Sequence, residues 1–285
     1  ASTGDSLTEN IALKESGGSF SVTGTKLSLS GGTTCSKNQA LKGGGGCILW
    51  EPLASDASSS LWLDMTPSLS SDTLLEGNQA AYGTIYATPG KSLRDSQSLL
   101  QKENQLRVSS LPGGVPLSPS PRILLLDHYE SIVVGTHANN ISPLQAGVAT
   151  HVESYLGGDL NAVINMTNGI TTFSRLELNG VPGTGPYELV INGNYELVPE
   201  NVTTTRTRLL EMIGGTVNMY IVSCPMNSYR FGTSCEPCPE HAESNFGSIS
   251  IDECICSDDK VMRKSIKKCD VCDSGEEKIG NRCLA

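Results

Sequence analysis

Ten cysteines are the residues of this chain whose type and spacing point most directly to chemistry. Two of them, Cys35 and Cys47, lie near the N-terminus. The other eight are confined to the last part of the chain and are Cys224, Cys235, Cys238, Cys254, Cys256, Cys269, Cys272 and Cys283. Cys-x-x-Cys motifs occur here at 235/238 and 269/272, and they are typical of zinc sites, of redox pairs and of disulfide frameworks.

Three features of the surrounding sequence favour disulfides over zinc. Cys254 and Cys256 interrupt the paired motifs, His241 is the only nearby histidine, and few apolar residues are present to build a core without cross-links. A thioredoxin-like redox pair would need a strand–helix–strand context, which the sequence does not indicate. Disulfides persist in oxidising compartments, so we expect an extracellular protein that is secreted or displayed at the cell surface.

Candidate glycosylation sites agree with this compartment. Three Asn-x-Ser/Thr sequons begin at Asn140, Asn165 and Asn201. Pro143 directly after the first sequon makes it the least favourable acceptor. Two Ser-Pro units, Ser118, Pro119, Ser120 and Pro121, favour polyproline II and are similar to O-glycosylated tracts of algal wall proteins; a rigid spacer is the alternative. Covalent glycans are therefore expected, and no cofactor is expected.

The length and charge of the chain limit its organisation and its partners. With 285 residues it exceeds the usual size of one domain, so two or three domains are expected. Its formal net charge is -10. Binding to nucleic acid or to anionic lipid requires a basic surface, which such an acidic chain is not expected to have. No apolar run approaches the roughly 18 residues that span a bilayer. We therefore expect no nucleic-acid partner and no direct membrane span.

The C-terminal cysteines follow a pattern that includes other residues at fixed places. Cys-x-x-Cys-Pro at 235–239 precedes Gly-Ser at 247–248 and Cys-x-Cys at 254–256. This pattern resembles ephrin-receptor-like and epidermal-growth-factor-like (EGF-like) modules, which implies a disulfide-rich spacer over residues 223–285. The simplest pairing that the resemblance implies is 224–235, 238–254, 256–269 and 272–283, although eight cysteines allow about 105 pairings.

Calcium is a further candidate ligand of this module. Asp252 and Glu253 stand before a cysteine, where calcium-binding EGF-like modules place acidic ligands. Ser250 occupies the first acidic position of that pattern, which removes one charged oxygen. A solvated acidic turn is the alternative, and no other metal site is predicted.

Residues 1–95 alternate short β-prone runs with glycine clusters and have no helical period, which predicts stacked short strands. The runs "CSKN" at 35–38 and "GGGGCI" at 43–48 resemble the paired signatures of polymorphic outer-membrane-protein repeats, and "EGNQAAYG" at 76–83 is similar to a second element. This resemblance implies the C-terminal coils of a right-handed parallel β-helix. Asn38 would stack its amide between coils, and Cys35 and Cys47 would replace inward-facing residues and bridge.

The number of coils bears on what lies next to them. A solenoid needs about three coils to bury a core, and only two or three are indicated here. We therefore expect either further coils upstream or a neighbouring subunit against the first coil, near residues 19–29. The chain starts at Ala1 without a leader, which indicates a processed chain or a piece of a longer product.

Residues 123–222 read as about seven short strands separated by Asn-Gly turns, which predicts a β-sandwich of immunoglobulin-like type. The stretch 170–191 resembles extracellular immunoglobulin-like repeats. That resemblance implies a core built from Phe173, Leu176, Leu178, Tyr187 and Leu189. Residues 96–122 are expected to form a linker or a strand connection.

The sequence does not indicate an enzyme. Asp127 beside His128 is expected at the end of a buried strand, with no nucleophile elbow near it. His137 and His151 have no ligand spacing. Parallel β-helices also house polysaccharide lyases, but Asp64 stands without a cluster of acidic and basic residues around it.

The order of an all-β chain with a β-helix end, a sandwich and a cysteine-rich module resembles giant surface or appendage proteins of algae and related protists, including those of mastigonemes, the hair-like filaments on some flagella. The resemblance implies a structural subunit of an extracellular filament or matrix whose partners are copies of itself or other filament or matrix proteins. An adhesion or glycan-binding receptor ectodomain is the alternative, and a polysaccharide-degrading β-helix enzyme is the third hypothesis.

Overall fold

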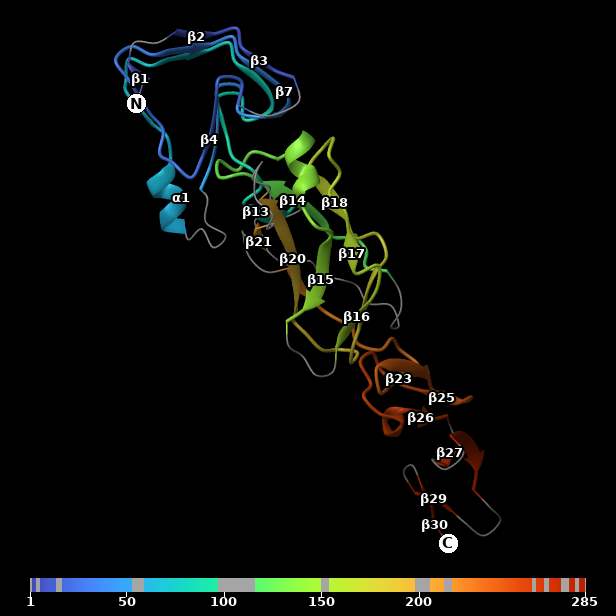
Figure 1. Ribbon diagram of the computed structural model, residues 1–285. Coiled ribbons are helices and arrows are strands. Elements are labelled where there is room, and N and C mark those ends of the chain that lie inside the picture. Colours follow the sequence, from blue (N-terminus) through green and yellow to red (C-terminus); the bar gives the residue numbers. More distant parts are fainter. Residues whose placement is uncertain are drawn as a thin grey trace.

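The computed structural model describes residues 2–3, 6–13, 17–52, 59–96, 116–149, 154–197, 206–212, 217–257, 260–263, 267–272, 277–279 and 282–284. Strands dominate these ranges, with one short α-helix and two 3-10 helices, so the chain is all-β as predicted. None of the helices in these ranges has the length and apolar character to cross a bilayer. Three regions follow one another along the molecule from the N-terminus to the C-terminus (Figure 1).

The N-terminal region consists of three stacked turns of chain with four strands each. Turn one contains β1 (Ser2–Thr3), β2 (Ser6–Thr8), β3 (Ile11–Ala12) and β4 (Phe20–Thr23). Turn two contains β5 (Ser28–Ser30), β6 (Thr34–Ser36), β7 (Gln39–Gly44) and β8 (Ile48–Glu51). Turn three contains β9 (Ser68–Leu69), β10 (Leu74–Glu76), β11 (Gln79–Tyr82) and β12 (Tyr86–Ala87).

Each strand pairs in parallel with the strand at the same place in the next turn, which gives four three-stranded sheets. The register repeats between turns, so that Leu7 of turn one and Leu75 of turn three both lie beside Cys35 of turn two. The helix α1 (Ser59–Met65), which the sequence did not predict, lies between β8 and β9. The segment that contains it lengthens the chain between turns two and three without changing the strand pairing.

A glycine is required at one corner of each turn. Gly17, Gly45 and Gly83 have φ angles of 74°, 73° and 58°, which side chains disfavour. A Cβ on Gly45 would lie 2.2 Å from the carbonyl oxygen of Ile48, and the other two glycines meet the equivalent oxygen. The glycine clusters of the sequence therefore mark these corners.

The central region contains an eight-stranded sheet, called the central sheet here, whose order is β17-β15-β20-β21-β13-β14-β18 with β22 paired to β20. Its strands are β13 (Ser92–Asp95), β14 (Arg122–Leu126), β15 (Leu144–Val148), β17 (Asn161–Ala162), β18 (Ile170–Thr172), β20 (Tyr187–Leu197), β21 (Arg206–Met212) and β22 (Val217–Met219). A separate two-stranded sheet is formed by β16 (Tyr155–Gly158) and β19 (Leu176–Asn179), and a 3-10 helix, η1 (Gly135–Asn140), precedes β15.

The core of this region contains the residues that the sequence predicted. Phe173, Leu176, Leu178, Tyr187 and Leu189 are all buried. They pack in one cluster with side chains from β13, β14 and turn three. The apolar spacing of residues 173–189 therefore indicated the inward-facing positions of β19 and β20.

The strand pairing divides the chain differently from the expected boundaries. Residues 92–95, which the sequence placed in the N-terminal unit, pair as β13 with β14 and β21 of the central sheet. The expected linker 96–122 also contributes to this region, because the Leu117 side chain is buried and its amide donates to the Leu176 carbonyl at 2.7 Å. Residues 97–115 lie outside the described ranges.

The C-terminal region is a series of short antiparallel hairpins that pair β23 with β24, β25 with β26, β27 with β28 and β29 with β30. The strands are β23 (Ser228–Phe231), β24 (Ser234–Pro237), β25 (Ala242–Glu243), β26 (Ile255–Cys256), β27 (Lys260–Arg263), β28 (Lys268–Val271), β29 (Glu277–Ile279) and β30 (Arg282–Leu284). A second 3-10 helix, η2 (Ile251–Glu253), precedes β26. Cysteines form much of the small core of the C-terminal region.

Candidate functional site

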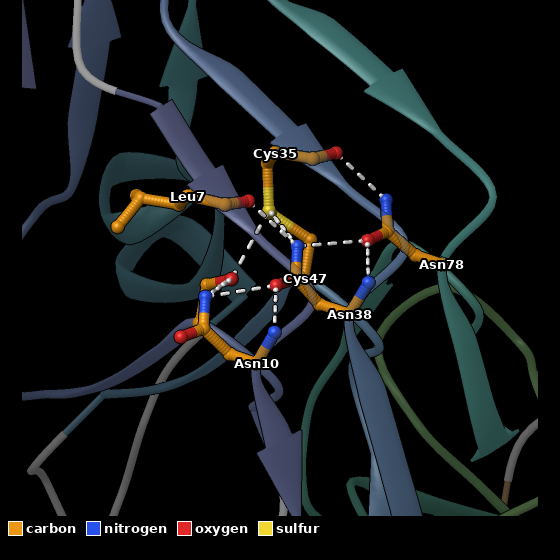
Figure 2. Close-up of a disulfide and its surroundings, with 7 residues drawn as sticks. Leu7, Asn10, Cys35, Asn38, Cys47 and Asn78 are labelled. Atoms are coloured by element: carbon orange, nitrogen blue, oxygen red, sulfur yellow. Dashed lines mark hydrogen bonds between the residues drawn. A yellow bond between two sulfur atoms is a disulfide. The ribbon is translucent and has the colours of Figure 1, made fainter.

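A disulfide crosses the interior of turn two (Figure 2). It joins Cys35 of β6 to Cys47, which directly precedes β8, and both residues are fully buried. This is the predicted pair. Apolar residues of the stacked turns and of α1 surround it, including Leu29, Ile48 and Trp62. The bridge therefore ties together two sides of one turn inside the core.

An asparagine beside the disulfide joins all three turns by hydrogen bonds (Figure 2). The Asn38 backbone N–H and Nδ2 both donate to Oδ1 of Asn78 in turn three at 3.0 Å, and Nδ2 also donates to the Leu7 carbonyl at 2.9 Å. Asn38 Oδ1 accepts from the backbone N–H and Nδ2 of Asn10 in turn one, both at 2.9 Å. The amide has the stacking role that the resemblance implied, since it satisfies backbone groups of a neighbouring turn.

The asparagine ladder, defined as Asn10, Asn38 and Asn78, has a direction. Asn10 donates to Oδ1 of Asn38 in the following turn, and Asn38 donates to Oδ1 of Asn78 in the turn after it. Asn78 Nδ2 donates to the Cys35 carbonyl of the preceding turn, just as Asn38 does to the Leu7 carbonyl. Sequence reasoning missed Asn10, although its spacing from Leu7 matches that of Asn78 from Leu75.

Aromatic residues join the stacked turns to the central sheet. Trp50 of β8 packs edge to face against Trp62 of α1, with ring centroids 5.5 Å apart, and Trp62 stacks on His128, which follows β14, also at 5.5 Å. Trp50 Nε1 donates to the hydroxyl of Tyr129 at 2.9 Å. His128 therefore contributes to the packing at this junction.

A buried ion pair lies at the same junction. Arg208 of β21 lies 3.2 Å from Glu51 Oε1 at the end of β8 and donates to the Gly90 carbonyl. Its guanidinium also lies over the rings of Trp62 and Tyr195, at 4.9 and 5.1 Å from their centroids. The five groups come from both regions, so the two regions share one polar core.

Burial shifts the ionisation of several groups at the junction. It raises the pKa of Glu51 to about 7, with Arg208 opposing this shift, and it raises the pKa of Asp127 to about 6. It lowers the pKa of both His128 and His137 to about 4. Asp127 Oδ1 accepts from the backbone N–H groups of Tyr129 and Ser131, so its carboxyl stabilises the turn after β14.

Three disulfides stabilise the C-terminal region, and their pairing is the one that the resemblance implied. They are Cys224–Cys235, Cys238–Cys254 and Cys256–Cys269. Cys272 is also disulfide-bonded. The side chain of Cys283 lies outside the described part, so the pairing of Cys272 with Cys283 stays a prediction.

The predicted modification sites differ in what the structure describes. Asn165 is exposed in the turn before β18, and its Oδ1 accepts from the Thr167 amide of the same sequon at 2.8 Å. Asn140 is the last residue of η1, its side chain is outside the described part, and Asn201 is outside it entirely. Of the Ser-Pro segment, Ser118 and Pro119 are exposed, Ser120 is half-buried and Pro121 is buried.

The candidate calcium ligands and the candidate catalytic residues of the described part lie on different elements. Asp252 and Glu253 lie in η2, where Glu253 Oε2 accepts from the Ile249 amide at 3.3 Å. Among the described side chains, no group of three or more His, Cys, Asp or Glu residues could hold a metal ion. Asp64 is exposed on α1, and His151 is outside the described part. Comparison of the chain with models of protein families, with curated proteins and with solved structures finds no match.

Proposed function

We propose that this chain is a non-catalytic structural segment of an extracellular filament or matrix, such as a mastigoneme-like appendage. The observation that carries the proposal is the arrangement of three regions in line, each with its own disulfide or hydrogen-bonded core (Figure 1). Such an arrangement provides length and stability rather than a pocket for a substrate.

The same proposal assigns a fold to each region. Parallel pairing of equivalent strands over three turns, together with the asparagine ladder, supports the end of a right-handed parallel β-helix. The central sheet and the separate β16-β19 pair, with the predicted core residues between their strands, support an immunoglobulin-like sandwich. Sequential disulfides between short hairpins support an EGF-like module.

The extracellular location rests on two observations. Four disulfides in the described part join eight of the ten cysteines and Cys272 is also disulfide-bonded, which is a level of cross-linking that reducing compartments do not sustain. Asn165 is exposed in a turn, as an acceptor of an N-linked glycan must be. Mass spectrometry of natively produced protein should therefore find a glycan at Asn165.

The test is to locate the protein in its native setting. Antibodies raised against residues 1–285 would be used for immunogold electron microscopy, with the same antibodies pre-absorbed on the purified chain as the control. Label at regular intervals along extracellular filaments or within a matrix is expected. Isolated label on the plasma membrane would contradict the proposal and favour an adhesion or glycan-binding receptor.

A further inference from the structure

Side-chain amides form a row across three neighbouring strands of the central sheet, β17, β15 and β20 (Figure 1). Gln145 of β15 lies directly opposite Asn161 of β17 on one side and directly opposite Asn192 of β20 on the other. Opposite residues of an antiparallel pair project from the same face, and all three side chains are exposed. With Ser142 and Asn194 they line a groove of about 310 Å³. Asparagine is depleted in strands, so sheet formation alone does not account for this amide row.

A second polar groove, of about 390 Å³, adjoins the first. Asn161 lines both grooves, and the second one is also lined by Asp159, Thr172 and the sequon residue Asn165. Its volume lies in the range of about 300–1,000 Å³ that is usual for small-molecule sites. The two grooves together therefore lead from a candidate glycosylation site to the amide row.

The path between Asn165 and Asn161 runs along one face of the chain. Asn161, Val163 and Asn165 are exposed, whereas Ile164 is buried, as alternation along an extended segment requires. Four residues of extended chain span about 13 Å. Asn165 Oδ1 accepts from the Thr167 amide, and within the described ranges its Nδ2 donates no hydrogen bond. Nδ2 is the atom that carries an N-linked glycan, and it is available at one end of this path.

We infer, on the basis of the proposed extracellular location, that the two grooves hold the proximal sugars of a glycan attached to Asn165 of the same chain. N-linked glycans begin with two N-acetylglucosamine units, whose hydroxyl and acetamide groups both donate and accept hydrogen bonds. A side-chain amide also offers donors and an acceptor, so the amide row matches this chemistry. The sugars run from Asn165 past Val163 towards Asn161 and Gln145.

Attachment at Asn165 favours this occupant over a free polysaccharide. Sugars that are tethered at one end of the groove have a high local concentration there and lose little further translational freedom when they settle in it. Val163 is 72% exposed and offers apolar surface to the face of a sugar ring. The outer strands β17 and β18 of the central sheet approach each other at the bridge between Asn165 and Ile170. A glycan at this place would also cover strand edges that could otherwise pair with another chain.

Enzymatic removal of the glycan from the folded protein tests the inference. The whole chain is secreted from eukaryotic cells, and mass spectrometry follows the release of the Asn165 glycan by peptide-N-glycosidase, before and after denaturation. Asn161→Ala removes the residue that both grooves share, and Gln79→Ala, an exposed strand amide of the stacked turns, is the matched control. Release from folded Asn161→Ala should be about tenfold faster than from the native chain or from Gln79→Ala, the factor that one or two hydrogen bonds provide. Gln145→Ala should act in the same direction.

Equal release from the native chain and from both groove variants would overturn the inference, because the glycan would then project into solvent. A free polysaccharide as the occupant is tested by titrating millimolar chitotetraose into the glycosylated chain and into Asn165→Gln, with binding followed by nuclear magnetic resonance. Equal binding to the two would show that the grooves stay open beside the glycan, and would also overturn the inference. A secreted chain without a glycan at Asn165 would overturn it too and would remove one support of the extracellular location, whereas equal release rates leave that location unaffected.

Discussion

Asn38 is the residue on which the contact between the three turns depends most. It is fully buried, and its side chain and backbone N–H form five hydrogen bonds with Asn10, Asn78 and the Leu7 carbonyl. A buried polar group that loses its partner costs more than a hydrogen bond between exposed groups contributes. Replacement of this side chain would leave unpaired groups on both neighbouring turns.

Asn38→Ala should lower the free energy of unfolding by about 3–4 kcal/mol, because several buried donors and acceptors lose their partners. Asn10→Ala is the matched control. It removes one rung at the exposed end and should cost about 1 kcal/mol. Urea unfolding at neutral pH measures both values. Equal losses for the two variants would show that the ladder does not join the turns as described.

His137 should make stability depend on pH. Burial holds its pKa at about 4, below its usual value of 6.5, so the unfolded chain binds a proton first as the pH falls. The stabilisation is complete above about pH 6.5 and is lost between about pH 6.5 and 4. The native chain should lose about 3 kcal/mol more over this range than His137→Gln does. Urea unfolding of both chains at several pH values tests this, and parallel pH profiles would refute it.

Part of this site could be predicted from single residues and part could not. Cys35, Cys47 and Asn38 were predicted because the glycine cluster beside them completes a recognisable pattern. Asn10 was missed because it lies 28 residues before Asn38, while Asn38 lies 40 residues before Asn78. The segment with α1 accounts for the unequal spacing, and only the strand pairing reveals that the three residues are equivalent.

At the scale of elements, close approach of the backbone sets how the turns stack. A Cβ on Gly46 would lie 2.2 Å from the Thr84 carbonyl oxygen of turn three, and one on Gly18 would lie 2.2 Å from the Gly46 carbonyl oxygen. The turns therefore touch through glycine at equivalent corners. The expectation of stacked short strands came from these glycines, whereas β13 and α1 were not predicted because their sequences are short and lack a clear period.

Gly46→Ala should destabilise the chain by about 2–3 kcal/mol, because the added methyl group overlaps a backbone oxygen that cannot move without shifting turn three. Gly147→Ala is the control. A Cβ at that position meets nothing within 4 Å, so stability should change by about 0.5 kcal/mol or less. Thermal unfolding of the two variants and of the native chain measures these changes in stability. A Gly46→Ala chain as stable as the native one would contradict the close packing of turns.

For the whole molecule, the junction between the stacked turns and the central sheet depends on contacts between residues far apart in sequence. Arg208 and Glu51 are separated by 157 residues, and both side chains are almost completely buried. No local pattern could have predicted this pair, because the sequence around each charged residue does not indicate a partner so far away in the chain. The sequence indicated both regions but not how they are joined.

Arg208→Met should separate the unfolding of the two regions. It leaves Glu51 buried without its cation, and loss of one partner of a buried pair costs about 3–5 kcal/mol. Scanning calorimetry should then resolve an earlier transition for the stacked turns. Adding Glu51→Gln should recover part of the loss. Arg94→Met removes a pair whose partner Glu130 is 62% exposed and should cost about 1 kcal/mol or less. A single unchanged transition in Arg208→Met would argue against the shared core.

The order of disulfides in the C-terminal region also determines how far that region can be pulled out. The three described bridges are sequential, and short segments, 235–238 and 254–256, connect one bridge to the next. A force applied to the two ends of the region is carried by the disulfide bonds. The loops that the bridges close therefore bear no tension. With about 3.5 Å per extended residue, the covalent route from Cys224 to Cys269 measures on the order of 35 Å, whereas the reduced chain would reach roughly 155 Å. The oxidised region is a short tether of nearly fixed contour length, and reduction would convert it into an extensible one.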